Sequence, residues 1–195
     1  PSYQSTFYTI VSPEPWFQIT FVSDAAGELN EGREGRATHL YSCRLDGSEI
    51  RRLTYSPSAD LDPFLLWDGR ILYGALRGYR GPWQLQEKVD LFTINSDGAD
   101  VALFSGFEGL PIKYMPAVSM EEQICLFVEK RAIDGRPGGR LGSVSIRRNL
   151  HSYESVTGVD DGEFLTPAPA PGGGFLVSSR VDQSQSYQLG FFDLT

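Results

Sequence analysis

The chain has 195 residues, of which 41% are hydrophobic and 12% aromatic, and this composition is that of a folded globular protein rather than a disordered one. Its formal charge of −8 argues against a nucleic acid as partner, because phosphate backbones are bound by basic surfaces. No apolar run approaches the roughly 18 residues that a membrane-spanning helix needs, so we expect no insertion into a membrane.

Short apolar segments, rich in β-branched and aromatic residues, predict strands along the whole chain. In chain order they are residues 18–22, 70–76, 90–94, 123–128, 142–146 and 174–179. Each is bounded by turn residues, with 21 Gly and 12 Pro distributed over the sequence. Helical periodicity is almost absent, so the sequence predicts an all-β protein.

Two features of the sequence repeat with a period of about 50 residues. Prolines with similar surroundings stand at positions 63, 116 and 167, which are 53 and 51 residues apart. Leucines in a second set of similar segments stand at positions 40, 91 and 141, which are 51 and 50 residues apart. A shared period of this size is typical of β-propeller blades, each a four-stranded antiparallel sheet.

The repeat predicts the strands of each blade. We expect the first strand to begin after the repeat proline, and Asp68-Gly69 to form the tight turn to the second strand. We therefore interpret residues 1–195 as one β-propeller segment with blades at about 5–55, 60–107, 112–158 and a partial fourth at 163–195. Because an incomplete ring leaves sheet edges exposed, we expect it to be part of a larger propeller whose remaining blades, or a protein partner, cover them. The alternative architecture is a β-sandwich with coincidental turn spacing.

The repeated residues carry a resemblance to a known family. The pattern "LT…D-x-x-P…D-G-R-I" followed by "L-F-x-x-N-x-D-G" resembles the blades of the TolB-like, WD-repeat-like β-propellers. The matching positions are Leu53, Thr54, Asp60, Pro63, Asp68, Gly69 and Ile71. This chain departs from the pattern at Leu65, Leu66 and Trp67, where the family usually has Trp, Ser and Pro, and Glu121-Glu122 replaces Asp-Gly in the third unit.

Residues 139–180 also resemble the propeller region of bacterial proteins related to the hydrazine synthase alpha subunit. The resemblances are specific for fold and not for function. A blade repeat without any catalytic constellation predicts a non-catalytic scaffold or protein-interaction module of a larger bacterial protein, in the periplasm or outside the cell. The alternative that the resemblances leave open is the propeller of an enzyme, a peptidase or a multi-haem oxidoreductase, whose catalytic residues lie outside this chain.

No catalytic or cofactor-binding motif is present in the sequence. It has no G-x-S-x-G, P-loop, H-E-x-x-H or C-x-x-C-H, and we expect neither a metal nor a cofactor. For His39 and His151 we expect structural or solvent-facing roles. For Cys43 and Cys125, which stand inside apolar runs, we expect buried free thiols.

Four acidic residues lie where the chain passes from one blade to the next. Asp60, Asp62, Asp160 and Asp161 could ring the mouth of a channel and bind a cation through their carboxylates. The alternative, which we favour, is that these short side chains cap turns by accepting hydrogen bonds from backbone N–H groups.

The longest connections fall at one place in each blade, between the second and third strands. They are residues 24–38, 78–89 and 132–139, and in a propeller they emerge on one face. Tyr79, Arg80 and Trp83 are the candidate partner-binding residues, since Tyr, Trp and Arg dominate interface hot spots. The alternative is a loop whose Trp folds back over the blade.

If this loop binds a partner, replacing Arg80 and Trp83 with Ala should weaken partner capture and leave the fold intact. Pull-down from native lysate, with circular dichroism to check the fold, measures both effects. Unchanged capture would contradict the assignment of the site.

Overall fold

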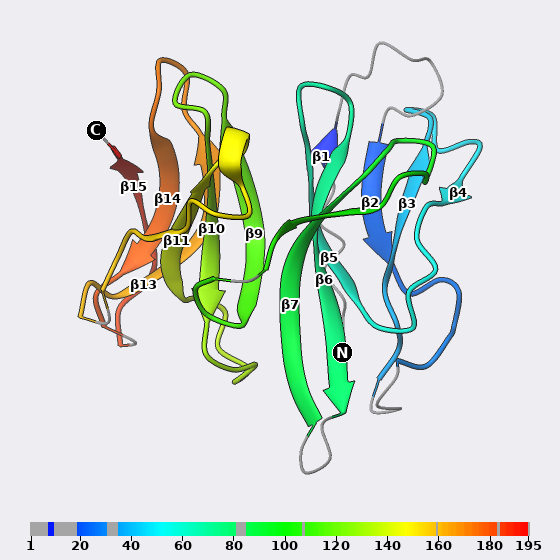
Figure 1. Cartoon of the computed structure of the whole chain (residues 1–195), viewed down its shortest axis with the longest axis horizontal. Helices are drawn as coiled ribbons and strands as arrows, with labels where there is room; N and C mark the ends of the chain where they lie inside the picture. Colours follow the sequence, from blue (N-terminus) through cyan, green and yellow to red (C-terminus); the bar gives the residue numbers. More distant parts are fainter. Residues whose placement is uncertain are drawn as a thin grey trace. The chain divides into compact units, whose positions relative to one another are not determined.

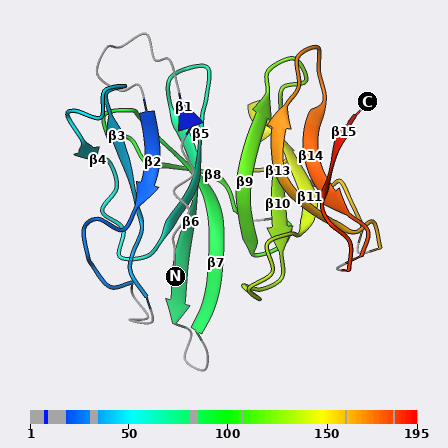
Figure 2. The same ribbon diagram turned by 180° about the vertical axis from the view of Figure 1, so that it is seen from behind.

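The computed structural model describes residues 8–9, 19–30, 35–80, 85–106, 108–158, 160–182 and 184–194 (Figures 1 and 2). Within these ranges the regular structure is β-strand, apart from one 3₁₀ turn, η1 (Ile146–Arg148). Each strand pair with a defined register is antiparallel, and the predicted all-β class is confirmed. None of the described segments forms a helix long and apolar enough to cross a lipid bilayer.

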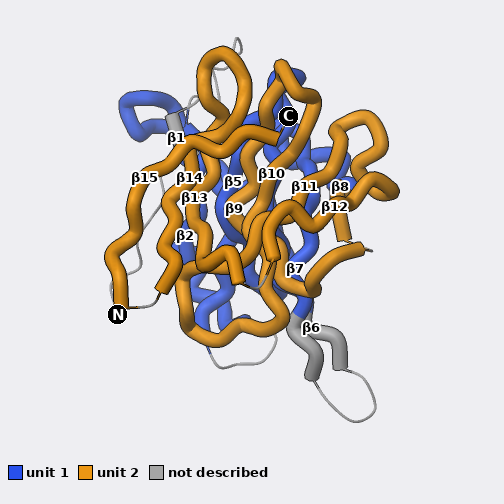
Figure 3. The backbone as a smooth tube through the Cα atoms, turned by 90° about the vertical axis from the view of Figure 1, so that its left-hand side faces the viewer, with its two compact units in different colours: residues 1–103 blue, residues 104–195 orange. Residues whose placement is uncertain are grey.

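The chain divides into two compact units, residues 1–103 and 104–195 (Figure 3). Unit 1 begins with strand group 1, in which β1 (Tyr8–Thr9), β2 (Ile19–Ser23), β3 (His39–Cys43) and β4 (Arg51–Arg52) pair in chain order. Asp46-Gly47 turns the chain from β3 to β4, with Gly47 at a φ of 78° and Asp46 Oδ1 accepting a hydrogen bond from the Ser48 N–H at 2.9 Å. This is the chemistry that an Asp-Gly turn requires.

Strand group 2 follows with β5 (Asp60–Leu65), β6 (Ile71–Arg80), β7 (Leu85–Ile94) and β8 (Ala102–Ser105), and the division between the units falls within β8. Here β5 pairs with β6, β6 with β7, and β7 with β8. Asp68-Gly69 forms the predicted turn between β5 and β6, with Gly69 at a φ of 86°.

The predicted loop at residues 78–89 is wrong in part. Strands β6 and β7 stay paired from Ile71↔Ile94 out to Arg80↔Leu85, so the connection is much shorter than expected. The segments 76–80 and 85–89 contain no proline, and each further backbone pair satisfies N–H and C=O groups that a loop would leave to water. The first strong turn signal is Gly81-Pro82, beyond the last pair.

Unit 2 holds strand group 3, in which β9 (Ile112–Ser119), β10 (Ile124–Lys130), β11 (Arg140–Ser145) and β12 (Glu154–Ser155) pair in chain order. Strand group 4 is a three-stranded sheet of β13 (Glu163–Pro169), β14 (Phe175–Arg180) and β15 (Gln188–Phe192). Its first strand lies against β9 and β10, as both ribbon views show (Figures 1 and 2).

The repeat prolines lie inside strands and not, as predicted, before them. Pro63, Pro116 and Pro167 fall within β5, β9 and β13. The residue before each has a positive φ, 48° at Asp62, 50° at Met115 and 44° at Thr166, and the pairing register shifts nearby. A β-bulge leaves a residue out of the ladder, which is why a proline without an N–H is tolerated there.

The Glu-Glu that replaces Asp-Gly in the third unit has a role between the two strand groups of unit 2. Glu122 Oε1 accepts a hydrogen bond from the Gly174 N–H at 2.8 Å, so the turn after β9 holds the turn after β13. Thr166 N–H also donates to Met115 Sδ at 3.4 Å, joining the two bulges. The departure from the family pattern therefore adds a contact between neighbouring strand groups.

The hydrophobic core of unit 1 lies between its two strand groups. It consists of Leu40, Leu53, Ile71, Tyr73, Ala75, Phe92 and Ile94. Alternating positions of β6 supply three of these side chains, and Leu72 between them is also buried, so this part of β6 is covered on both faces. Cys43 and Cys125 are buried free thiols, as predicted.

A buried hydrogen-bond relay joins strand groups 1 and 2. The Leu40 N–H donates to Thr54 Oγ1 at 2.9 Å, and the Thr54 hydroxyl donates to Asp60 Oδ2. The backbone of Asp60 is held as well, since its C=O accepts from Thr38 Oγ1 and its N–H donates to the Thr38 C=O, both at 2.9 Å. Thr54 and Asp60 of the family pattern therefore fix the passage from one strand group to the next.

Unit 2 repeats half of this relay. The Leu141 N–H donates to Thr157 Oγ1 at 2.8 Å, at the position that matches Leu40 and Thr54. The residue that matches Asp60 is Phe164, which cannot accept the threonine proton. Comparing variants of Thr54 and Thr157 therefore separates the contribution of the bond from the backbone N–H, which both threonines accept, from that of the bond to the carboxyl, which only Thr54 donates.

Replacing Thr54 with Val should lower the free energy of unfolding by about 2 kcal/mol, because the Leu40 N–H and the Asp60 carboxyl both lose a buried partner. Replacing Thr157 with Val should cost about 1 kcal/mol, because only the Leu141 N–H is left unpaired. Urea denaturation of the chain and both variants measures the difference, and a loss at Thr157 as large as at Thr54 would contradict the relay.

Candidate functional site

Asp60, predicted as a channel-mouth residue, lies in a buried polar cluster of unit 1. Its side chain is 1% exposed, and the fully buried His39 places its Nδ1 3.9 Å from Asp60 Oδ2. On the other side of the His39 ring, Arg52 Nη2 lies 3.0 Å from Nε2. Arg52 also makes two hydrogen bonds of 2.9 and 2.8 Å with the Glu28 carboxylate.

Burial determines the charge state of this cluster. It raises the pKa of Asp60 to about 6, against the lowering effects of Thr54, Arg77 and Arg52. Burial and, next, the Arg52 charge hold the pKa of His39 below its usual value. His39 is fully buried, so of its two predicted roles the solvent-facing one is wrong and the structural one stays a prediction.

The other predicted acidic residues lie in different surroundings. Asp62 occupies the bulge of β5 at positive φ. Asp160 and Asp161 lie in the turn before β13 in unit 2, where Asp161 Oδ2 accepts a hydrogen bond from the Gly158 N–H at 2.6 Å. The turn-capping alternative is thus confirmed for Asp161, and the channel mouth stays a prediction.

The predicted partner-binding residues are described only in part. Tyr79 and Arg80 form the last pairs of β6, opposite Gln86 and Leu85, so their backbone is strand and not loop. Trp83 lies outside the described residues. The role of these three residues in binding a partner stays a prediction.

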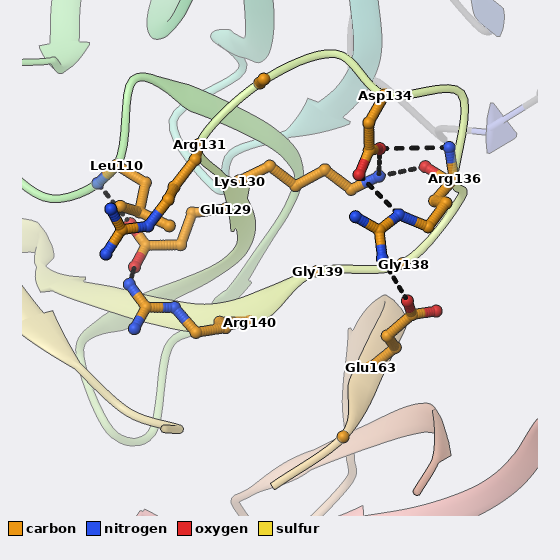
Figure 4. A pocket seen from close by; sticks show the side chains of 12 residues that line it. Leu110, Glu129, Lys130, Arg131, Asp134, Arg136, Gly138, Gly139, Arg140 and Glu163 are labelled. Carbon is orange, nitrogen blue, oxygen red and sulfur yellow. Dashed lines mark hydrogen bonds and ion pairs between the residues drawn. The ribbon is translucent and has the colours of Figure 1, made fainter. Parts of the chain in front are cut away.

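The connection at residues 131–139 covers a pocket of about 390 Å³ in unit 2 (Figure 4). Its walls come from the end of β10, from this connection, from the start of β11, and from Gly162 and Glu163 at the start of β13. It therefore lies where strand groups 3 and 4 meet. Close approach of the backbone requires glycine here, since a Cβ on Gly139 would lie 2.6 Å from the Glu129 carbonyl oxygen.

Three carboxylates line this pocket, and each is already engaged. Glu129, fully buried, accepts hydrogen bonds from Tyr153 Oη at 2.7 Å and from the Leu110 N–H at 3.0 Å. Burial, together with the bond to Glu129, raises the pKa of Tyr153 to about 12, so the tyrosine stays a donor.

The other two carboxylates pair with cations. Asp134 accepts from Lys130 Nζ at 3.1 Å and from Arg136 Nε at 2.6 Å, and the Lys130 bond is the main reason that the pKa of Asp134 falls to about 2. Glu163 accepts from Arg180 at 2.6 and 3.0 Å and from Tyr187 Oη at 3.1 Å. Among the described residues no group of three or more His, Cys, Asp or Glu side chains is arranged to hold a metal ion.

Sequence reasoning identified the 132–139 connection as long but singled out no residue of this pocket. The available signal was the density of charge in "EKRAIDGRPGGR" (residues 129–140), where six of twelve residues are charged. No pattern in the sequence indicated that Glu163 lines this pocket, because its place there depends on how β13 packs against β10.

Comparison with known proteins places the fold. No family model matches the chain, and no curated protein sequence matches it. Hydrazine synthase from Kuenenia stuttgartiensis superposes with a TM-score of 0.73 and 23% identity, over 90% of this chain and 26% of that one. TolB from Acinetobacter baumannii superposes with a TM-score of 0.58 and 18% identity, over 80% of this chain and 35% of that one.

The fold is propeller-like. Both of these proteins contain a β-propeller, and the likeness supports the predicted architecture over the β-sandwich alternative. The chain spans about a quarter of the first protein and about a third of the second.

The raised pKa of Asp60 predicts how stability depends on pH. Because the folded-state pKa of about 6 lies above the unfolded value of 3.8, the stability that protonated Asp60 gives is complete below about pH 4 and is lost as the pH rises through 6. Asp60→Asn should remove this loss, which amounts to about 3 kcal/mol at most.

Urea denaturation between pH 4 and 7 gives the difference between Asp60→Asn and the unchanged chain at each pH. His39 is present in both proteins, so its own titration largely cancels. Asp160→Asn, which removes one charge from an exposed turn, controls for net charge. A difference that is constant over this pH range would contradict the assignment.

Proposed function

We propose that this chain is a β-propeller module with blades at about 5–55, 60–107, 112–158 and 163–195, and that it serves as a non-catalytic scaffold for protein interaction in a larger extracytoplasmic bacterial protein. The observation that carries the proposal is an exposed apolar face on strand group 4. This face is formed by Leu176, Leu189 and Phe191.

The corresponding face of strand group 3 shows what such a surface does in this fold. There Cys125 pairs with Val144, and the two side chains are 0% and 1% exposed. Counted from the repeat prolines, the matching pair in strand group 4 is Leu176 and Phe191, which are 37% and 62% exposed.

The next outward-facing position repeats this contrast. By the same count, Phe127 matches Ser178, and its partner Gly142 matches Leu189. Phe127 is buried in strand group 3, whereas Leu189 is 73% exposed in strand group 4. At both pairs of matching positions the apolar side chains are covered in strand group 3 and open in strand group 4. This supports a further blade as the occupant, because the same strand register would repeat the packing between groups 3 and 4.

A second candidate function is the propeller of an enzyme whose reacting groups lie elsewhere in the full protein. The structural likeness to hydrazine synthase favours this second candidate, since the matched region is 26% of that chain. The sequence flanking this chain discriminates between the two. A G-x-S-x-G or C-x-x-C-H motif there supports the enzyme, and further blades without one support the scaffold.

The open face predicts that residues 1–195, expressed alone, associate with themselves in solution. Leu189→Lys with Phe191→Lys should lower the average mass toward that of the monomer, because two charges would have to be buried in the contact. Sedimentation equilibrium over a range of concentrations measures the effect.

Ile50→Lys with Val101→Lys is the matched control, since these side chains are 62% and 53% exposed but lie outside strand group 4. This variant adds the same charge and should associate as the unchanged chain does. A chain that is monomeric at all concentrations, or equal effects of the two double variants, would contradict the proposal.

A further inference from the structure

The pocket of unit 2 has two arginines whose guanidinium groups donate no hydrogen bond to its own carboxylates. Arg140 Nη2 lies 3.5 Å from Glu129 Oε1, a distance at which the charges attract but the guanidinium donates no hydrogen bond. Arg131 is exposed and makes neither an ion pair nor a hydrogen bond with any of the described residues. Figure 4 shows the Arg131 side chain toward the Glu129 and Arg140 end of the pocket, away from Asp134.

The hydrogen bonds of the three carboxylates are made with other groups, and Glu129 only forms an ion pair with Arg140. Glu129 is occupied by Tyr153 and Leu110, and the ion pairs of Asp134 and Glu163 lie toward the other end of the pocket (Figure 4). Counting side chains on the wall, four cations (Lys130, Arg131, Arg136 and Arg140) face three anions. The pocket therefore has a positive excess within a chain whose net charge is −8.

A planar guanidinium offers paired N–H donors whose geometry matches a carboxylate or a phosphate. The lining also includes Leu110, Ala132 and three glycines, which leaves room for a small apolar group beside the anion. The volume of about 390 Å³ lies at the lower end of the range for small-molecule pockets.

We propose that this pocket binds a small organic anion, a carboxylate or a phosphate monoester, through Arg131 and Arg140. Lys130 and Arg136, held by Asp134, keep the opposite wall in place and do not contact the anion directly. The inference is independent of the scaffold function, since it concerns residues of unit 2 and needs no further blade.

Titration calorimetry with two probes, acetylglycine for the carboxylate and phenyl phosphate for the phosphate, tests the proposal on the complete chain. We expect saturable one-to-one binding of at least one probe. Arg131→Gln with Arg140→Gln should weaken it at least tenfold. The probe that binds more tightly identifies which of the two anions the pocket prefers.

Two further variants separate a pocket from general attraction between charges. Arg147→Gln with Arg148→Gln removes two exposed arginines of η1 and should leave binding unchanged. Ala132→Phe keeps all charges and fills the pocket from its rim, so it should weaken binding. Circular dichroism and urea denaturation confirm that each variant is folded.

No saturable binding of either probe would overturn the proposal. So would binding that falls equally in the η1 double variant, or binding that Ala132→Phe leaves intact. None of these outcomes changes the self-association expected from strand group 4, so failure of this site and failure of the scaffold function are distinguishable.

Discussion

The structure depends on the burial of both faces of its short sheets. A group of three or four strands of two to ten residues buries too little apolar surface to be stable by itself, and it becomes stable only against a neighbour. In unit 1 that contact is the core from Leu40 to Ile94, and in unit 2 it is the apposition of β13 with β9 and β10. Strand group 4 has one such neighbour, through Phe175 and Val177, while Leu176, Leu189 and Phe191 remain open to solvent.

Polar residues, and not only apolar ones, determine how neighbouring groups meet. The Thr54 hydroxyl links a backbone N–H of one group to a carboxyl of the next, and Glu122 spans two turns in unit 2. Such bonds add little net stability when they form, but breaking one leaves a buried group unpaired. They therefore favour one register between groups over the alternatives.

The sequence predicted the strands, the Asp-Gly turns and the period well because each has a local cause. Strands follow from alternating apolar residues, and the turns follow from the positive φ that Gly47 and Gly69 adopt. Both signals lie within a few adjacent residues. The prediction that the repeat prolines precede the strands was wrong because a bulge depends on pairing with the partner strand. The register shift between Leu61 and Phe64 shows this. The length of the connection at 78–89 was overestimated because the pairing of β6 with β7 continues out to Arg80 and Leu85.

The pocket was beyond the reach of sequence patterns for a related reason. Arg131, Asp134, Arg136 and Arg140 are close in the chain, but Glu129 becomes a buried acceptor only because Tyr153 and Leu110 reach it from other segments. The 14 arginines against 3 lysines of this chain gave a hint of fixed ion pairs but not of their places. Long-range packing decides which arginines are neutralised and which keep free donors.

The position three residues before each repeat proline has a consequence for how the groups follow one another. It is Asp60, Lys113 and Phe164 in successive repeats, and all three are buried. Asp60 needs a hydroxyl donor, Lys113 donates to the Leu110 carbonyl at 3.2 Å, and Phe164 lies edge-on to Phe192. Of the three, Asp60 takes its partner Thr54 from the preceding strand group, whereas the contacts of Lys113 and Phe164 lie within their own groups. Strand group 2 moved to another place in the chain would leave the Asp60 carboxyl without this donor, so this side chain ties the second repeat to the first.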